Sequence, residues 1–216
     1  GTPGFQGRYC ASADHRPRSH FNGRRHPVLI MDREWQTAWS VGRLLSLRWP
    51  YGEEGMTPTV RAALERGVEV HRACEAWDLG QGYTPSLEIE PYLEAWKSYC
   101  RAHTPSWAED GIEHRFDSNE GFHGVIDRVG NIHGVDTCLE IKSSRRGGPS
   151  HPRTAIQLAA YTLAYYGKVR APRIKRLEVQ LCDGAYRIFT HSQLADFLVV
   201  QELLQEAGIC ETTHWL

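Results

Sequence analysis

The spacing of apolar residues changes along the chain from a helical period to a period of two. Residues 34–48, 57–80 and 91–103 carry apolar side chains at helical spacing, which predicts three helices. From residue 112 onward apolar and polar residues alternate, which predicts three strands, at residues 112–117, 121–130 and 135–144. The helical spacing returns in two later segments, residues 154–167 and 192–207, with Gly167 as a stop and Ser192 as a cap.

Turn residues complete the predicted order of elements. Asp183-Gly184 separates apolar runs at residues 174–181 and 186–190, which is a strong hairpin signal, and His133-Gly134 allows a tight connection between the two preceding strands. Because hairpins join several of the strands, we expect an α/β fold with a mixed β-sheet flanked by helices. Gly67 inside the second helix costs about 1 kcal/mol relative to alanine, and it indicates a packing reason, such as close approach to another backbone.

The domain organisation follows from where this periodicity begins. Residues 1–30 are polar, rich in Gly, Arg and His, and aperiodic, so we expect a flexible basic arm, either native or preceding a natural start near Met31. Residues 31–216 have the length of a single domain. No apolar run approaches the ~20 residues of a membrane helix, and no secretory signal is present, so we expect a cytoplasmic protein without membrane contact.

Charge is balanced over the whole chain but not along it. The formal net charge is −1, yet no acidic residue occurs between Ile141 and Leu177. We expect a cationic face for a polyanion such as DNA; the alternative is a solvated surface balanced by acidic neighbours in space. The basic residues of this stretch are Lys142, Arg145, Arg146, Arg153, Lys168, Arg170, Arg173, Lys175 and Arg176.

Candidate chemistry lies at the ends of two predicted strands. Asp127 ends one apolar run, and Glu140 and Lys142 end the next, where their spacing of two places both side chains on one face. Carboxylates of this kind hold Mg²⁺, with the backbone carbonyl of Ile141 as a further oxygen ligand. Lys142 then positions or deprotonates a water, or offsets developing charge, and its pKa is either lowered by burial or held up by the carboxylates. The plain alternative is an ion pair on the surface of a strand.

Five short motifs in order carry a family resemblance. From about Val41 to Tyr161 the chain resembles the PD-(D/E)XK nuclease superfamily, and within it the RecB-like group of phage and repair exonucleases. The resemblance implies a restriction-endonuclease-like fold and DNA cleavage that depends on Mg²⁺ or Mn²⁺. The motifs, in chain order, are VGRLLSL, RGVEVHRACE, GVIDRVG, LEIKSS and QLAAYTLAY.

The resemblance also implies roles for single residues. Asp127 and Glu140 resemble the metal carboxylates, Lys142 the catalytic lysine, and His71 the histidine close to the metal. Glu75, four residues after His71 on the same helical face, is a further ligand or an exposed helix acid.

Three other residues complete the implied site. Glu113 occupies a strand position where relatives often have an acid. Gln157 and Tyr161 share a helix face and are expected to orient Lys142 or a DNA phosphate; their alternative role is an amphipathic helix with a buried tyrosine.

The residues after Lys142 are expected to contact DNA. Hydroxyl and guanidinium groups suit phosphate oxygens, and the candidates are Ser143, Ser144, Arg145, Arg146 and Arg153. Relatives with an iron–sulfur cluster have three cysteines after the last motif, whereas only Cys182 and Cys210 follow Tyr161 here, so no cluster is expected. No Walker A motif occurs, so a helicase or single-strand-annealing protein is the expected partner for unwinding or annealing.

Together these features predict a metal-dependent DNA exonuclease acting in phage-type recombination or repair. Three alternatives stay open from the sequence: a non-catalytic DNA-binding or assembly module on the same fold, a structure-specific endonuclease, and a small-molecule metallohydrolase on another fold.

Overall fold

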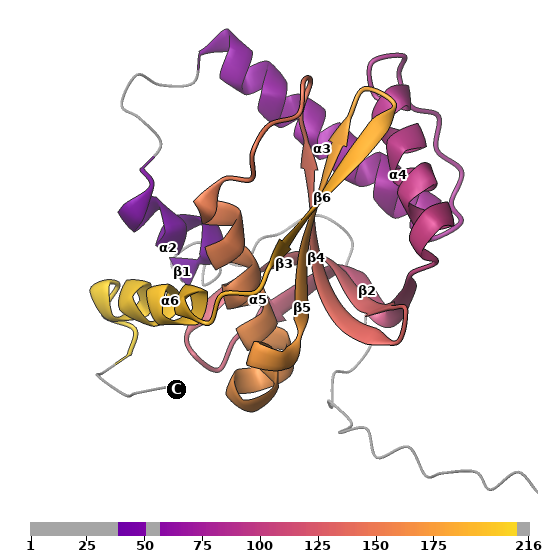
Figure 1. The fold of residues 1–216 in the computed structure, drawn as a ribbon. Helices are drawn as coiled ribbons and strands as arrows, with labels where there is room; N and C mark the ends of the chain where they lie inside the picture. The colour runs from indigo at the N-terminus through magenta and orange to yellow at the C-terminus, as the bar shows by residue number, and fades with distance from the viewer. Residues whose placement is uncertain (1–38, 51–56, 211–216) are drawn as a thin grey trace, which may run out of the picture. The chain divides into compact units, whose positions relative to one another are not determined.

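A six-stranded mixed β-sheet forms the centre of the described structure (Figure 1). The computed structural model describes residues 39–50 and 57–210, so the arm predicted at residues 1–30 lies outside the described residues. The strand order is β1-β3-β4-β5-β6, and β2 also pairs with β3. The strands are β1 (Trp39–Ser40), β2 (Ser106–Asp117), β3 (Phe122–Ile132), β4 (Val135–Ser143), β5 (Lys175–Cys182) and β6 (Ala185–His191).

The sheet combines antiparallel hairpins with parallel pairs. Strand β3 is antiparallel to β2 and β4, and β5 is antiparallel to β6, whereas β4 and β5, and also β1 and β3, run parallel. The turns at His133-Gly134 and Asp183-Gly184 join the two predicted hairpins. The predicted fold class, α/β with a mixed sheet flanked by helices, is therefore confirmed.

Helices cover both faces of the sheet. They are α2 (Val41–Arg48), α3 (Pro58–Asp78), α4 (Glu90–His103), α5 (Pro152–Arg170), the short 3₁₀ helix η1 (Ala171–Arg173) and α6 (Ala195–Glu206). Leu139 and Ile141 of β4 are buried in one core with residues of α3 and α4, whereas Cys138 is buried in a second core with residues of α2, α5 and α6. Because side chains alternate along a strand, Glu140 and Lys142 project toward α5.

Several predicted boundaries shift in the structure. Trp39 and Ser40, which we expected in the first helix, form β1, and the Ser40 hydroxyl accepts a hydrogen bond from the Arg43 N–H and so caps α2 at 3.1 Å. The last helix begins at Ala195, so Ser192 is not its cap. Gly167 does interrupt α5, as predicted, with a left-handed φ of 73°.

Two further predictions were tested by packing and helix composition. The close backbone approach predicted at Gly67 is wrong, because a Cβ there would meet only the Ser143 hydroxyl, 3.9 Å away. In the part of the chain that the structure describes, none of the helices is both long and apolar enough to cross a membrane.

Candidate metal centre

The strands β3 and β4 separate at the predicted site. Their ladder runs from the pair Ile132–Val135 to the pair Arg128–Leu139 and ends there. Beyond it, the Ile141 N–H donates a hydrogen bond to the Asp127 Oδ2 atom at 2.6 Å, so a side chain takes the place of a backbone acceptor. The N–H and C=O of one strand residue face the same neighbour, so the Ile141 carbonyl also faces this opening.

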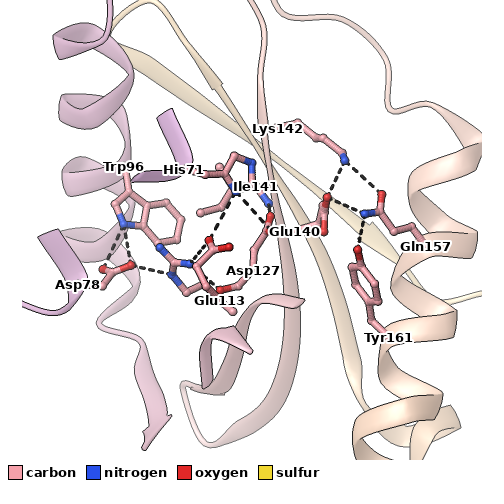
Figure 2. A network of polar contacts seen from close by, with 11 residues as sticks. His71, Asp78, Trp96, Glu113, Asp127, Glu140, Ile141, Lys142, Gln157 and Tyr161 are labelled. Atoms are coloured by element: carbon pink, nitrogen blue, oxygen red, sulfur yellow. Dashed lines mark hydrogen bonds and ion pairs between the residues drawn. The ribbon is translucent and has the colours of Figure 1, made fainter. Parts of the chain in front are cut away.

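Three potential ligands from three elements meet at the opening (Figure 2). The ligand atoms of His71 on α3, Glu113 on β2 and Asp127 on β3 all lie within 4.8 Å of one another. The His71 Nδ1 atom is 3.4 Å from Asp127 Oδ1 and 3.6 Å from Glu113 Oε1. His71 and Asp127 were predicted as ligands, and Glu113 lies at the strand position where the resemblance implied an acid.

Glu113 reaches the cluster through an unusual backbone conformation. Its φ is 49°, in the left-handed region that residues other than glycine rarely adopt. It lies between the β2–β3 pairs Ile112–Arg128 and His114–Ile126, opposite Asp127. Such a conformation costs about 1–3 kcal/mol and persists only where the surroundings hold it. Glu75 is not a member of the cluster, and burial and the nearby Glu113 charge raise its pKa.

A second group of polar side chains lies on the α5 side of the opening (Figure 2). The Lys142 ammonium donates to Glu140 Oε1 at 2.6 Å and to Gln157 Oε1 at 3.2 Å. The Gln157 amide donates to the same Glu140 oxygen at 2.9 Å and to the Tyr161 hydroxyl at 2.8 Å. Gln157 therefore joins Glu140, Lys142 and Tyr161 into one network.

The charges of the cluster act strongly on one another. Burial, followed by the Glu140 charge, raises the pKa of Asp127 to about 7. Burial works against the protonated His71 ring, but the charges of Asp127, Glu113 and Glu140 outweigh it and raise the His71 pKa to about 9. Burial also opposes ionisation of Glu113, but its contacts with His71 and Arg128 lower its pKa. Without a bound cation, the site therefore retains protons at neutral pH.

The open question about Lys142 is answered by its neighbours. Burial disfavours the ammonium, but the Glu140 carboxylate, followed by Asp127, outweighs burial and raises the pKa of Lys142. Burial and the charges of Glu140 and Asp127 also raise the pKa of Tyr161 far above its usual value. At neutral pH Lys142 is a cation and Tyr161 a neutral phenol, so neither is a ready base.

The residues present fit a divalent cation. Glu140 Oε2 is buried and has no hydrogen-bond donor among the described residues, although an unsatisfied buried carboxylate oxygen is costly. A cation bound between Asp127 and Glu140 would satisfy that oxygen and relieve the repulsion of the carboxylates. Oxygen ligands suit both Mg²⁺ and Mn²⁺, and the His71 nitrogen favours Mn²⁺.

The acid-free basic stretch divides between the two ends of the sheet. Lys142 pairs with Gln180 in the parallel β4–β5 ladder, and Thr137 pairs with Lys175, roughly 16 Å farther along the strands. At that far end Lys168, Arg170 and Arg176 form ion pairs with Glu120, Asp136 and Asp196, respectively. The prediction of a single cationic face over residues 141–177 is therefore wrong. Only the first part of this stretch lies at the site.

The residues predicted to bind DNA follow the site directly. Ser143 and Ser144 are half-buried, and the Ser144 hydroxyl accepts a hydrogen bond from the Gly147 N–H at 3.1 Å. Arg145 and Arg146 are exposed, and Arg145 Nη2 lies 3.3 Å from a carboxylate oxygen of Glu88.

Beside them a pocket of about 430 Å³ opens against Lys142, Arg153, Gln157 and Tyr161. The Arg153 guanidinium donates to the Gly42 carbonyl at 3.3 Å. Charged and polar side chains therefore line this pocket, and Glu178 contributes a carboxylate to it.

Comparisons with known proteins show no relationship from which a family follows. No family model matches the chain, and no curated protein matches it. Among solved structures, the crystal structure of SSO0001 is similar over 82% of this chain and 86% of that chain, with 16% sequence identity and a TM-score of 0.36. That likeness is too distant to support an argument about function.

Proposed function

We propose that the protein is a metal-dependent DNA nuclease of the PD-(D/E)XK superfamily, RecB-like group, acting as an exonuclease in recombination or repair. The observation that carries the proposal is the convergence of His71, Glu113 and Asp127 beside a buried Glu140 that holds Lys142. Residues from α3, β2, β3 and β4 thus supply ligands and a cation at one opening in the sheet. A cytoplasmic location and a helicase or annealing partner belong to the same proposal.

The roles of the residues follow from their contacts. His71, Glu113, Asp127 and Glu140 would hold Mg²⁺ or Mn²⁺, with the Ile141 carbonyl facing the same opening. When bound, such an ion neutralises phosphate charge and lowers the pKa of a coordinated water. The chain then has to bind the phosphodiester, orient it and stabilise the charge that develops on it.

Lys142 is suited to the last of these tasks. It is held as an ammonium by Glu140 and fixed in place by Gln157, and its side chain is 37% exposed, so it can still contact substrate. A preorganised cation beside a developing phosphorane charge lowers the barrier to hydrolysis. Tyr161 keeps Gln157 in place through their hydrogen bond and so acts on Lys142 indirectly.

The approach of DNA is supported by the segment between β4 and α5. Arg145 and Arg146 are exposed there, and Arg153 lines the pocket next to Lys142. Guanidinium groups bind phosphate oxygens in two-pronged geometry. Arg145 and Arg146 lie in a loop, and Arg153, in the first turn of α5, donates to the Gly42 carbonyl, so the three residues do not form a helix face that reads base edges. The substrate is therefore a nucleic-acid backbone without a fixed sequence.

Digestion of defined DNA ends tests the proposal. End-labelled linear DNA and a covalently closed circle are incubated with the protein in Mg²⁺, Mn²⁺ or EDTA. We expect loss of label from the linear DNA with either metal, no reaction in EDTA and an intact circle. Cleavage of the circle identifies an endonuclease instead. Binding of DNA without metal-dependent cleavage identifies a non-catalytic module, and hydrolysis of nucleotide monoesters alone identifies a small-molecule hydrolase.

A further inference from the structure

A fully buried arginine lies directly behind the metal centre. Arg128 on β3 is 0% exposed. Its Nη1 atom donates to Glu113 Oε1 at 3.0 Å and to the Asp127 carbonyl at 2.5 Å. Its Nη2 atom has no hydrogen-bond acceptor within the described part of the chain. A buried guanidinium is expensive, so its contacts to two residues of the cluster call for an explanation beyond packing.

The other side of Arg128 is anchored to two helices. Its Nε atom donates to Asp78 Oδ2 at 2.7 Å, at the end of α3. The Trp96 indole N–H on α4 lies 3.1 Å from each oxygen of the same carboxylate, and the guanidinium carbon lies 5.5 Å from the centre of the Trp96 ring. Asp78 and Trp96 thus contact the guanidinium through its Nε atom and its face, while Glu113 accepts from its Nη1 atom.

The strained backbone conformation of Glu113 has to be stabilised by contacts of its side chain. A residue with φ of 49° within a strand keeps that conformation only where the surrounding structure, its side-chain contacts included, holds it. Relaxation would turn the carboxylate away from His71, since side-chain direction in a strand depends on the backbone. The described contacts that hold the Glu113 carboxylate come from Arg128 and from His71.

We propose that Arg128, anchored by Asp78, is a positioning residue that keeps the Glu113 carboxylate turned toward His71 and Asp127 as a metal ligand. The inference rests on the proposed metal-dependent function. It assigns the ion pair between Arg128 and Glu113 to metal affinity rather than to folding alone. Groups of this kind behind a metal ligand typically change metal affinity by about 10–100-fold when replaced.

Metal titration of paired variants tests the inference. Mn²⁺ affinity is measured by calorimetry for the wild type and for Arg128→Lys, Asp78→Asn, Glu113→Gln and the combination of Arg128→Lys with Glu113→Gln. Lysine cannot contact Asp78 and Glu113 at the same time, because it lacks the guanidinium fork. We expect Arg128→Lys and Asp78→Asn to weaken Mn²⁺ binding about 10–100-fold. In the Glu113→Gln background, Arg128→Lys should add less than about threefold.

The chain offers a matched control in Arg176. This residue is 2% exposed and lies 2.9 Å from a carboxylate oxygen of Asp196, but it does not contact the cluster. Arg176→Lys should lower thermal stability in EDTA and leave Mn²⁺ affinity unchanged. If Arg128→Lys fails to fold, the same comparison is made with Asp78→Asn in the presence and absence of Glu113→Gln.

Two results would overturn the inference. The first is that Arg128→Lys and Asp78→Asn bind Mn²⁺ with an affinity within about twofold of the wild type. The second is that Arg128→Lys lowers the Mn²⁺ affinity equally with and without Glu113→Gln, which marks an independent, structural effect. If either result is found while the wild type cleaves DNA with Mn²⁺, only the role of Arg128 is refuted and the proposed function stands. If the wild type neither binds Mn²⁺ nor cleaves DNA, the proposed function fails together with the role of Arg128.

Discussion

Each charged residue of the centre owes its state to its neighbours. Glu140 holds Lys142 as an ammonium, and the carboxylates around His71 keep its ring protonated in the metal-free protein. Burial and the Glu140 charge keep Asp127 partly protonated near neutral pH. Metal ligands bind in their deprotonated forms, so binding has to displace these protons. The site is therefore tuned by pH as well as by its geometry.

Metal affinity should rise with pH. The His71 pKa of about 9 and the Asp127 pKa of about 7 mean that Mn²⁺ competes with protons below pH 9. We expect the affinity to increase steadily from pH 6 to pH 9 and binding at pH 7 to release protons. Calorimetry in two buffers with different ionisation enthalpies measures both. Affinity that is constant over this range would contradict the pKa values on which the prediction depends.

The sequence identifies some members of this centre and hides others for physical reasons. Asp127, Glu140 and Lys142 are visible because each ends an apolar strand, where a charge is unusual. Glu113 was indicated only by the family resemblance, because its direction depends on a left-handed backbone that no turn residue predicts. Arg128 is hidden because its anchor, Asp78, lies 50 positions away in the chain.

At the scale of elements, the separation of β3 and β4 creates the centre. The hairpin is regular near its turn, and its ladder ends where Asp127 bonds the Ile141 N–H. The opposite edge of β3 is held tightly to β2, since a Cβ at Gly130 would lie 2.3 Å from the Ser106 carbonyl. A rigid edge on one side and an opening on the other give His71 access from α3 to carboxylates on the sheet.

Alanine substitutions at two glycines should change the free energy of unfolding in opposite directions. Gly67→Ala adds a Cβ with 3.9 Å of clearance inside α3, so it should raise the free energy of unfolding by about 0.5–1 kcal/mol. Gly130→Ala forces β2 and β3 apart and should lower that energy by about 1–3 kcal/mol. Urea denaturation measures both. Destabilisation by Gly67→Ala would show that α3 packs more closely there than described.

Arginines in the loop after β4 and arginines at the far end of α5 should differ in their contribution to DNA binding. Arg145 and Arg146 lie next to the site, whereas Arg170 and Arg173 lie at the opposite end of the sheet. Combined replacement of the first pair by alanine should weaken DNA binding and reduce the slope of log affinity against log salt by up to about 2. Replacement of the second pair should change neither. Fluorescence anisotropy in EDTA measures both, and equal effects would refute the DNA path.

For the whole molecule, periodicity predicted the α/β class and the hairpins, because these depend on local patterns. The sequence did not reveal that α3 and α5 lie on opposite faces and meet the same opening, since that depends on the pairing of distant strands. Nor did it separate the two halves of the basic stretch, which are joined in sequence by α5 but lie apart along β4 and β5. The strand register therefore determines which of these charges lie at the site.

The melting temperature of the metal-free protein should depend on the charges of the centre. A group whose pKa is higher in the folded than in the unfolded protein lowers the free energy of unfolding as the pH rises between the two values. For Asp127 this range is about pH 4 to 7, and for His71 it is about pH 6.5 to 9. The melting temperature in EDTA should therefore fall between pH 6 and pH 9. At pH 8, Mn²⁺ at 100 times its Kd should add about 2.7 kcal/mol, or roughly 5–10 °C.

The variant Asp127→Asn provides the control for this measurement. It removes a buried charge from the cluster and keeps an oxygen that accepts the Ile141 N–H. We expect it to melt at a higher temperature than the wild type in EDTA at pH 8 and to show little response to Mn²⁺. A full response to Mn²⁺ in this variant would mean that the ion binds elsewhere.

Cleavage by the Lys142→Ala variant is the most direct test of a metal-dependent nuclease in which Lys142 stabilises the reacting phosphate. Its activity on linear DNA is compared with that of the wild type and of Lys168→Ala, which replaces a lysine in the last turn of α5. DNA and Mn²⁺ binding are measured for all three proteins. We expect metal-dependent cleavage by the wild type and Lys168→Ala. For Lys142→Ala we expect a rate lowered by at least about 100-fold, with DNA and Mn²⁺ binding retained. Wild-type cleavage rates in Lys142→Ala, or no cleavage by the wild type with either metal, would contradict the proposed function.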